Sequence, residues 1–487
     1  MPTTTSSSSV PSLSDTRAAL ERIGQHHVLR FVDNLSDAQQ RALCAQIASL
    51  PLSEIPSLVE QYVRSKPESS SPAELQPAPF YPDDRDKPVS LWGRERYEKA
   101  GEDLIRAGKV AAFTVAGGQG TRLGFDGPKG CYPAGAVTKK PLFAMLADSI
   151  LAAQDRYSAR IPWAIMTSPL NHDATVAFFA DNKHFGLDPA LVTFFPQGVM
   201  PSFDMQTGAL LLNEKHEIAT NPDGHGGALR ALRNSGTLDR LSAQGVEHLS
   251  YCQIDNPIVR VVDPLFLGLH ATAPDSSAEM SSKMVVKTNP SEKVGVFAQS
   301  VGKTLIMEYS DLPANMADAR DRDNTLLFKA ANIAVHVLSL AFIDRLTSGE
   351  ANQALPYHRA EKKVPFVDLA TGQRVEPNAP NAVKLEMFVF DALPLCEKSL
   401  VMETLRVEEF APIKNSSGVD SPESSARIQT ERAARWLESI GITVPRNADG
   451  LANCTLEISP CTATCAADLK NAKGVPSSVK PGDSLAF

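Results

Sequence analysis

Several things that this sequence lacks narrow its class. It has no run of about 18 apolar residues, the length that a membrane-spanning helix needs, so we expect no membrane association. Its first residues, MPTTTSSSSVPSLSD, contain no apolar stretch after a basic start, and therefore do not match a secretory signal. It has no basic surplus either. The net charge of -8 argues against nucleic-acid binding but still allows a local cationic pocket for an anionic substrate.

The cysteines also lack the pattern of an extracellular protein. There are seven, an odd number, and they are scattered along the chain. This usage suits reduced thiols better than a disulfide framework. We therefore predict a cytoplasmic location.

The length and the changes in pattern along the chain predict several domains. A chain of 487 residues is too long for one compact core and fits two or three domains. We predict a helical N-terminal region with a flexible tail and a linker at 1–92, a central α/β domain at 93–398, and a small C-terminal domain at 399–487.

The central part alternates short apolar runs with helical patterns. The strand-like runs are Val110–Val115, Ile161–Thr167, Leu191–Phe195, Val246–Ile254 and Met284–Lys287, and helical patterns between them include Pro141–Gln154 and Asp173–Asn182. We also predict a β-hairpin joined through Gly302 and Lys303, and a long apolar helix at Ala331–Leu346. This alternation predicts an α/β fold with a mixed, mostly parallel sheet, which binds ligands at the carboxyl ends of its strands.

A glycine-rich loop, VAGGQGTRLG, follows the first predicted strand of this part. Its glycines let backbone N–H groups approach an anion closely, and Arg122 and Lys129 add cations suited to phosphate. The spacing is not that of a dinucleotide fingerprint, because Leu123 stands where the third glycine belongs. It is not a P-loop either, because Lys129 is followed by Gly130 and not by Ser or Thr.

The longer stretch GGQGTRLGFDGPKG resembles the nucleotide-binding loop of the eukaryotic-type UDP-N-acetylglucosamine pyrophosphorylases. Other segments between about Leu104 and Asn415 look like further blocks of that family in the same order: IPWAIMTS, FFPQGVMPSFD, NPDGHGG, YCQIDNPIVRVVDP, KTNPSEKVGV, EYSDL, FKAANIAVH, PNAVKLEMFVFDAL and EEFAPIKN. The resemblance is weakest after Asn415. It implies that residues 93–398 form a Rossmann-like nucleotidyltransferase domain and that the C-terminal domain is a small α/β domain.

The resemblance also implies an activity. It implies that UTP and N-acetylglucosamine 1-phosphate react to UDP-N-acetylglucosamine and pyrophosphate, by in-line attack at the α-phosphorus. Because the attacking phosphate is already an anion, positioning, cations and a metal ion carry the catalysis. By resemblance, Arg122, Lys129 and Lys414 are the catalytic cations. Asp255 ends an apolar run, where a strand-end carboxylate meets a ligand, and the resemblance makes it the ligand of Mg²⁺, or of Mn²⁺ in its place.

Further residues are assigned to the substrates by the same resemblance. Gln197 and the backbone of Gly224 read uracil, because a base edge needs paired donors and acceptors. The residues assigned to the nucleotide are Gly117, Gly118, Gly120, Thr121, Gln197, Pro222 and Gly224, and those assigned to the sugar and its phosphate are His225, Gly226, Asn256, Glu308, Asn332 and Lys384. We place Asn332 near the start of the predicted helix, where it could instead be an N-cap, and we expect Asp263 to cap a helix.

His225 keeps alternatives open. The N-acetylglucosamine enzymes typically carry Asn at this place, and His is reminiscent of UDP-glucose-type pyrophosphorylases. One alternative is therefore a UDP-glucose or broad-specificity UDP-sugar pyrophosphorylase. Another, from a different class, is a UDP-sugar-binding regulatory protein without catalytic activity.

Overall fold

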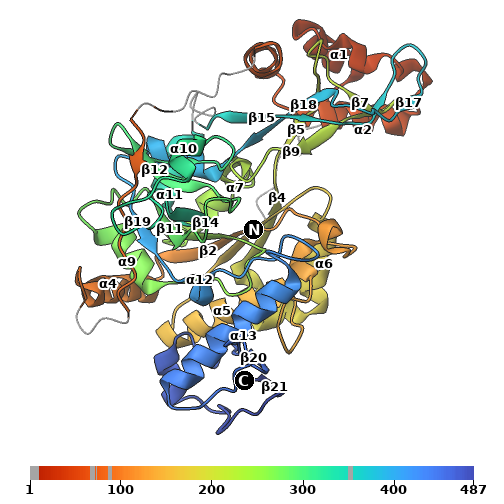
Figure 1. Ribbon diagram of the computed structural model, residues 1–487. Coiled ribbons are helices and arrows are strands. Elements are labelled where there is room, and N and C mark those ends of the chain that lie inside the picture. The colour runs from red at the N-terminus through yellow and green to blue at the C-terminus, as the bar shows by residue number, and fades with distance from the viewer. Residues whose placement is uncertain (1–9, 66–71, 73, 86–89, 349–354) are drawn as a thin grey trace. The chain divides into compact units, whose positions relative to one another are not determined.

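The computed structural model describes residues 10–65, 72, 74–85, 90–348 and 355–487 (Figure 1). The chain falls into two compact units. The smaller comprises Met1–Ser70, Gly198–Gly227 and Leu355–Val389, and the larger comprises Ser71–Gln197, Ala228–Ala354 and Phe390–Phe487. The predicted boundaries at 92 and 398 stay predictions, and most of the predicted tail and part of the linker lie outside the described residues.

A large mixed sheet forms the centre of the larger unit (Figure 1). Its main path is β1 (Gln76–Pro77), β12 (Val296–Ser300), β14 (Ala330–Ser339), β10 (His248–Gln253), β2 (Val110–Val115), β3 (Trp163–Thr167) and β4 (Val192–Pro196). Strands β11 (Met280–Val286), β13 (Lys303–Met307) and β19 (Val401–Glu403) join beside it. Strands β10, β2, β3 and β4 are parallel neighbours, whereas β14 runs antiparallel to β10, β11 and β12. The predicted α/β class with a mixed sheet is confirmed.

Helices cover the parallel strands on one face through a continuous apolar core. The helices that contribute to this core are α4 (Arg94–Arg106), α5 (Leu142–Tyr157), α6 (His172–Asp181) and α9 (Pro264–Thr272). On the other face, the Phe113 ring of β2 contacts the rings of Phe195 and Tyr251, at centroid distances of 6.0 Å and 5.5 Å. Strand β2 is buried along almost its whole length, so the backbone at the start of the loop that follows it is held in a fixed position.

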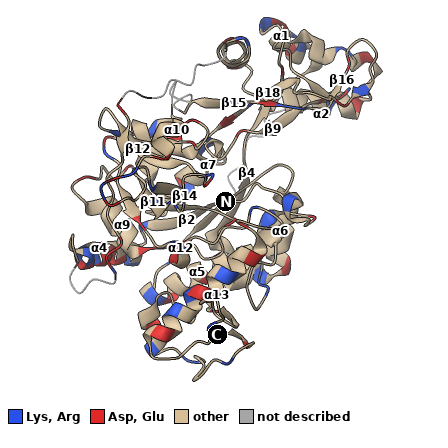
Figure 2. Ribbon diagram, in the orientation of Figure 1, with Lys and Arg blue, Asp and Glu red and all other residues tan. Residues whose placement is uncertain are grey.

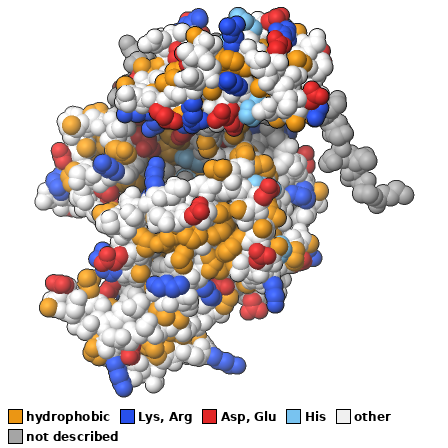
Figure 3. All heavy atoms as spheres, turned by 90° about the vertical axis from the view of Figure 1, so that its right-hand side faces the viewer, with side chains coloured by type: hydrophobic (Ala, Val, Ile, Leu, Met, Phe, Trp, Pro, Cys, Tyr) orange, Lys and Arg blue, Asp and Glu red, His pale blue; other side chains and the backbone are white. Residues whose placement is uncertain are grey.

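The parallel part ends at β4, which lies at the edge of the sheet. Near this edge, Leu170 is 79% exposed, and Phe178 and Phe194 are partly buried against the core. Figure 3 shows hydrophobic side chains gathered on the side of the molecule to which α6 and β4 belong. The apolar core therefore continues to the surface at this edge.

The prediction of one helix at Ala331–Leu346 is wrong. These residues form most of β14, which ends at Ser339, and most of helix α11 (Leu340–Thr347), whose N-cap is Ser339. An apolar run that is buried on both faces does not alternate, so periodicity alone cannot tell a strand from a buried helix. The β-branched Ile333, Val335 and Val337 favour the strand. The predicted hairpin of β12 and β13, by contrast, is confirmed.

The smaller unit combines helices with a three-stranded sheet. Its helices are α1 (Leu13–Arg22), α2 (Asp37–Ser49) and α3 (Ile55–Leu58), which a π-helix continues over Val59–Arg64, and its sheet order is β15 (Tyr357–Lys362), β18 (Ala382–Met387) and β6 (Phe203–Asp204). The side chain of Gln46 on α2 donates to and accepts from the backbone of Ile218, at 3.0 Å and 2.8 Å. The predicted helical N-terminal region is confirmed.

The last part of the chain has a core of its own within the larger unit. Helix α13 (Pro422–Ser439) packs against strands β20 (Thr455–Glu457) and β21 (Ser484–Ala486), which pair in parallel. The Glu457 carboxylate accepts from the backbone N–H groups of Val137 and Thr138, at 2.8 Å each. These bonds fix the C-terminal part to the segment that precedes α5.

Two further observations concern the helices and the cysteines. None of the helices in the described ranges has the length and apolarity that crossing a membrane would require. All seven cysteines are free thiols.

Buried histidine should make the stability of the fold depend on pH. Burial lowers the pKa of His270 to about 3, and His248, whose ring lies 5.1 Å away, adds to this. Below the ordinary histidine pKa of about 6.5, the unfolded chain takes up a proton that the folded His270 does not. The free energy of unfolding should therefore fall by about 1.4 kcal/mol per pH unit on account of His270 between pH 6.5 and about 3, with no contribution above this window.

Urea unfolding at several pH values checks this expectation. His270→Phe should make the slope shallower by about 1.4 kcal/mol per pH unit between pH 6 and 4, whereas replacing the exposed His26 with Gln should leave the slope unchanged. Equal slopes for wild type and His270→Phe would contradict the assignment.

Candidate nucleotide site

The glycine-rich loop after β2 folds back on itself. The Gly120 N–H donates to the Gly127 carbonyl at 2.9 Å, and the Lys129 N–H donates to the Gly118 carbonyl at 3.0 Å. A side chain at Gly120 would lie 2.7 Å from the Phe125 ring, so the fold of the loop requires glycine there. As a result, Lys129 lies opposite Gly118, although ten residues lie between them in the sequence.

A buried amide that the sequence analysis missed holds this loop. Asn171, at the N-cap position of α6, donates to the carbonyls of Ala116 and Gly118 at 3.0 Å and 3.2 Å. Its side-chain oxygen accepts from the Ser168 N–H at 2.8 Å. Asn171 therefore fixes the backbone at the start of the loop. Nothing in its sequence context distinguishes it from an ordinary helix cap.

Lys129 and Asp255 face each other across the carboxyl ends of two neighbouring parallel strands. The distance between Lys129 Nζ and Asp255 Oδ2 is 3.6 Å, and the two side chains are 15% and 14% exposed. Asp255 follows β10, which pairs with β2, the strand that precedes the glycine-rich loop. The structure thus brings together the cation and the carboxylate that the sequence analysis assigned to one ligand. Arg122 lies on the exposed turn Thr121–Leu123 of the same loop and has no ion pair among the described residues.

The segment that carries Lys414 is attached to the same strand end. The Ile413 N–H donates to the Asp255 carbonyl at 2.9 Å. Next to it, the Asn256 side chain donates to the Glu409 carbonyl at 2.6 Å and accepts from the Ala411 N–H at 3.1 Å. Asn256 is buried, and both ends of its amide bind backbone. Its role here is to hold this segment, and its assignment to the sugar stays a prediction.

Lys414 has an acidic neighbour that the sequence analysis did not single out. Lys414 Nζ lies 3.9 Å from Asp420 Oδ2, and the Lys414 N–H donates to the Asp420 carbonyl. Burial raises the pKa of Asp420; Lys414 opposes this shift, and Asp255 adds to it. The site therefore contains two lysines and two carboxylates from three separate parts of the sequence.

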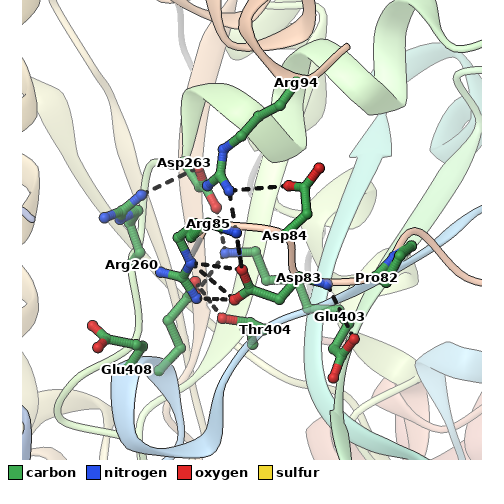
Figure 4. Close-up of polar contacts among 12 residues, drawn as sticks. Pro82, Asp83, Asp84, Arg85, Arg94, Arg260, Asp263, Glu403, Thr404 and Glu408 are labelled. Carbon is green, nitrogen blue, oxygen red and sulfur yellow. Dashed lines mark hydrogen bonds and ion pairs between the residues drawn. The ribbon is translucent and has the colours of Figure 1, made fainter. Parts of the chain in front are cut away.

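A buried cluster of ion pairs lies next to the segment that carries Lys414. Lys283 on β11 is completely buried, and its ammonium lies 2.6 Å from both Asp263 Oδ2 and Glu409 Oε2. Asp263 caps α9, as predicted, by accepting from the Leu265 N–H. Burial would raise the pKa of Asp263, but the Lys283 and Arg260 charges outweigh this effect and hold that pKa well below its usual range. Figure 4 shows Asp263 beside Arg260 in this cluster.

Gln197 is the only residue assigned to uracil that belongs to the larger unit. Its backbone N–H donates to Thr167 at the end of β3, and its side chain is buried. A side chain at Gly117 would lie 3.0 Å from Gln197 Oε1, so the amide lies directly beside the glycine-rich loop.

The other residues assigned to uracil and several of those assigned to the sugar belong to the smaller unit. The loop Pro222–Gly227 packs against the end of β18: the Gly226 N–H donates to the Met387 carbonyl at 2.8 Å. Gly224 has a φ of +85°, and a side chain there would lie 2.3 Å from the Met387 carbonyl oxygen, which explains the glycine. Lys384 lies on β18, where burial lowers its pKa, Glu386 opposes this shift and Lys362 adds to it.

His225 is a neutral, stacked histidine. Its ring stacks on Phe388 at 5.2 Å, and Phe388 stacks on His358 at 4.2 Å. Burial lowers the pKa of His225 to about 4, and His358 adds to this. Because Nδ1 accepts from the Val389 N–H at 3.1 Å, Nε2 carries the proton of the neutral ring.

Glu308 and Asn332 lie on either side of Gly295 in the larger unit. The Asn332 N–H donates to the Gly295 carbonyl at 2.9 Å, and a side chain at Gly295 would lie 3.0 Å from Glu308 Oε1. Glu308 directly follows β13. Asn332 lies on β14 and not at the start of a helix, which corrects the prediction of its position.

The fold and the site together define a nucleotide-binding α/β protein of the nucleotidyltransferase class. The family model described as UTP--glucose-1-phosphate uridylyltransferase matches residues 57–429. The chain belongs to this family.

Relatives with known names agree with the resemblance that the sequence motifs showed. The chain is 34% identical over 473 residues to UDP-N-acetylglucosamine diphosphorylase 2 of Arabidopsis thaliana, which covers 92% of this chain and 90% of that protein. The solved uridine diphosphate N-acetylglucosamine pyrophosphorylase of Trypanosoma brucei matches with a TM-score of 0.80 and 25% identity, over 96% of this chain and 98% of that one. A UDP-glucose phosphorylase structure from the same organism matches at 16% identity and a TM-score of 0.60, over 91% and 90% of the two chains, and this likeness shows the fold alone. The predicted family is confirmed.

Proposed function

We propose that this chain transfers a uridylyl group from UTP to N-acetylglucosamine 1-phosphate, forming UDP-N-acetylglucosamine and releasing pyrophosphate. The observation that carries the proposal is the 3.6 Å separation of Lys129 Nζ and Asp255 Oδ2 beside the glycine-rich loop. The names of the relatives that match along nearly the whole chain support the substrate pair.

The chain's own cations perform the chemistry in this proposal. The sugar phosphate oxygen attacks the α-phosphorus without a general base, and pyrophosphate leaves on the opposite side. Lys129 and Arg122 neutralise charge on the triphosphate, while Lys414 meets the incoming phosphate from the segment held by Asn256. Backbone N–H groups of Gly117, Gly118 and Thr121 surround the nucleotide phosphates, and Gly120, whose own N–H is bound to the Gly127 carbonyl, lets the loop come close to them.

Asp255 suits a magnesium ion that arrives with the nucleotide. Among the described residues no group of three or more His, Cys, Asp and Glu side chains could hold a metal by itself. Mg²⁺ commonly takes one or two carboxylates and completes its shell with phosphate oxygens and water, so a lone strand-end Asp255 fits it, and Mn²⁺ would fit in its place. When bound, the ion supplies positive charge to the phosphates.

The remaining assigned residues select the substrates. We assign uracil to Gln197 and to the backbone of Pro222 and Gly224. We assign the sugar and its phosphate to His225, Gly226, Glu308, Asn332 and Lys384, with Asn256 as an indirect support. The cytoplasmic location and the lack of nucleic-acid and membrane partners stay predictions.

A UDP-glucose or broad UDP-sugar pyrophosphorylase is the second candidate, and His225 favours it. The neutral His225 ring, whose Nδ1 accepts from the Val389 N–H, differs in its hydrogen-bonding groups from an asparagine amide, which has both a donor and an acceptor. Either group can bind a sugar hydroxyl.

A substrate panel separates these candidates. With UTP and Mg²⁺, pyrophosphate release should be at least about tenfold higher in kcat/KM for N-acetylglucosamine 1-phosphate than for glucose 1-phosphate, a difference of about 1.4 kcal/mol. Chelation of the metal should abolish the activity. Equal or reversed preference would select the second candidate, and no release with any sugar 1-phosphate would select a binding protein without activity. His225→Asn, run beside the wild type, tests whether this residue sets the ratio.

A further inference from the structure

A cavity of about 100 Å³ lies within the larger unit, apart from the glycine-rich loop. Its walls come from α5, from the loop 257–264 that follows Asp255, and from α13 and the C-terminal segment 457–465. The described residues that line it include neither Lys129, nor Asp255, nor Lys414. Figure 2 shows that α13 carries both basic and acidic residues.

Most carboxylates in the wall of this cavity already have donors. Glu409 is bound to Lys283 and Thr404, Asp148 to Lys140, Glu457 to backbone N–H groups at Val137 and Thr138, and Glu408 to the Trp436 indole N–H at 2.9 Å. These acids have donors of their own, and the charges of Glu408 and Glu409 compensate the Arg432 guanidinium only in part.

Arg432 on α13 is the cation least compensated by a neighbour. Its guanidinium stacks 4.7 Å above the Trp436 ring and donates to the carbonyls of Ile258 and Glu408 at 3.3 Å each. Within the described part of the chain it has no carboxylate at ion-pair distance. Burial lowers the pKa of Arg432 to about 10; Glu408 opposes this shift, and Arg260 adds to it.

Arg260 brings a second guanidinium to the same wall from the loop 257–264. It donates to the Thr464 carbonyl at 2.7 Å, and its ion pair with Asp263 is long, at 3.6 Å, because Asp263 is bound more closely by Lys283. Its side chain is 25% exposed, so solvent reaches it. Four arginines line this cavity. Arg85 and Arg156 pair with Asp83 and Asp468, so Arg432 and Arg260 are the two that an anion in the cavity would compensate most.

We propose that this cavity binds a phosphate-sized tetrahedral oxyanion between Arg432 and Arg260. The planar fork of a guanidinium matches two oxygens of such an anion, and the volume is well below the roughly 300 Å³ at which pockets for larger ligands begin. A bound anion would link α13 to the loop that follows Asp255. The site would therefore join the C-terminal part of the chain to the strand end that carries the catalytic carboxylate.

Calorimetric titration of the full chain with inorganic phosphate tests the proposal. Saturating UTP is present, so that the proposed catalytic site is filled, and the titration is repeated without UTP in Lys129→Ala, so that the result does not depend on the proposed function. One phosphate site should appear both in the wild type with UTP and in Lys129→Ala without UTP, with a rise in Tm of a few degrees at high phosphate. Arg432→Gln should weaken phosphate binding about tenfold or more, as expected for the loss of a charge-assisted contact.

Matched variants distinguish phosphate binding at this cavity from a general attraction of phosphate to positive charge on the protein. Arg427→Gln removes an exposed arginine from the same helix and should leave the phosphate affinity unchanged. Arg260→Gln should weaken binding as Arg432→Gln does, which keeps the test valid if one of the two variants fails to fold. The absence of phosphate binding in the wild type with UTP and in Lys129→Ala without UTP, or equal affinities for wild type and both site variants, would overturn the proposal.

Discussion

Replacing Lys129 with alanine should lower kcat for pyrophosphate release about 10²–10³-fold, which corresponds to about 3–4 kcal/mol of barrier. The reason is the position of the ammonium, 3.6 Å from Asp255 Oδ2 and across the folded loop from Gly118. In the proposed reaction, charge moves from the α-phosphate to the leaving pyrophosphate, and a fixed cation stabilises the transition state more than the ground state. Steady-state rates with UTP, N-acetylglucosamine 1-phosphate and Mg²⁺ measure the loss, and thermal unfolding verifies that the variant is folded.

The chain offers a matched control for this variant at the other end of the same strands. Lys109 precedes β2 and pairs with Glu247, which precedes β10. Lys109→Ala therefore removes a lysine from the amino ends of these strands, where the parallel sheet places no ligand. Its rate should match that of the wild type, and its stability should change by less than about 1 kcal/mol. A loss below tenfold in Lys129→Ala, or similar losses in both variants, would contradict the assigned role.

The sequence predicted the position of a residue well where the local pattern of apolar residues and glycines determines the secondary structure. Val110–Val115 is apolar along its length and is followed by glycines, and it forms β2 with the same bounds. Parallel sheets bind ligands at the carboxyl ends of their strands, and Asp255 follows such an end. Its place near a ligand could therefore be predicted from the sequence alone. The pairing of β10 with β2 then brings Asp255 to Lys129.

The residues that the sequence did not reveal act through contacts between distant parts of the chain. Asn171 looks like a helix cap and binds the carbonyls of the glycine-rich loop more than fifty residues earlier. Lys283 directly precedes the apolar residues of Met284–Lys287 and has its partners 20 residues before it and 126 residues after it. Asn332 was assigned to a helix because a doubly buried strand has no alternation to reveal it. In each case tertiary contacts, not local pattern, decide the role.

Replacing Lys283 alone should lower the free energy of unfolding strongly. Lys283→Met keeps most of the side-chain volume but leaves Asp263 and Glu409 as two buried carboxylates without their shared ammonium. Removing one partner of a buried ion pair typically costs about 3–5 kcal/mol, because the remaining charge is uncompensated. Urea unfolding should show this decrease in the free energy of unfolding, and the activity of the folded fraction should also fall. The activity should fall because Glu409 lies five residues before Lys414, on the segment that Asn256 and Asp255 hold.

Two further variants test whether the loss of stability comes from the buried carboxylates or from the removal of any lysine charge. Lys99→Met breaks an exposed pair with Asp103 and should cost less than about 1 kcal/mol. Adding Asp263→Asn and Glu409→Gln to Lys283→Met removes the two stranded charges, and should recover a large part of the lost stability since the penalty comes from the buried carboxylates themselves. If the triple variant is as unstable as Lys283→Met, the cost lies in packing and not in charge, and the cluster cannot be the electrostatic support that fixes the Lys414 segment behind Asp255.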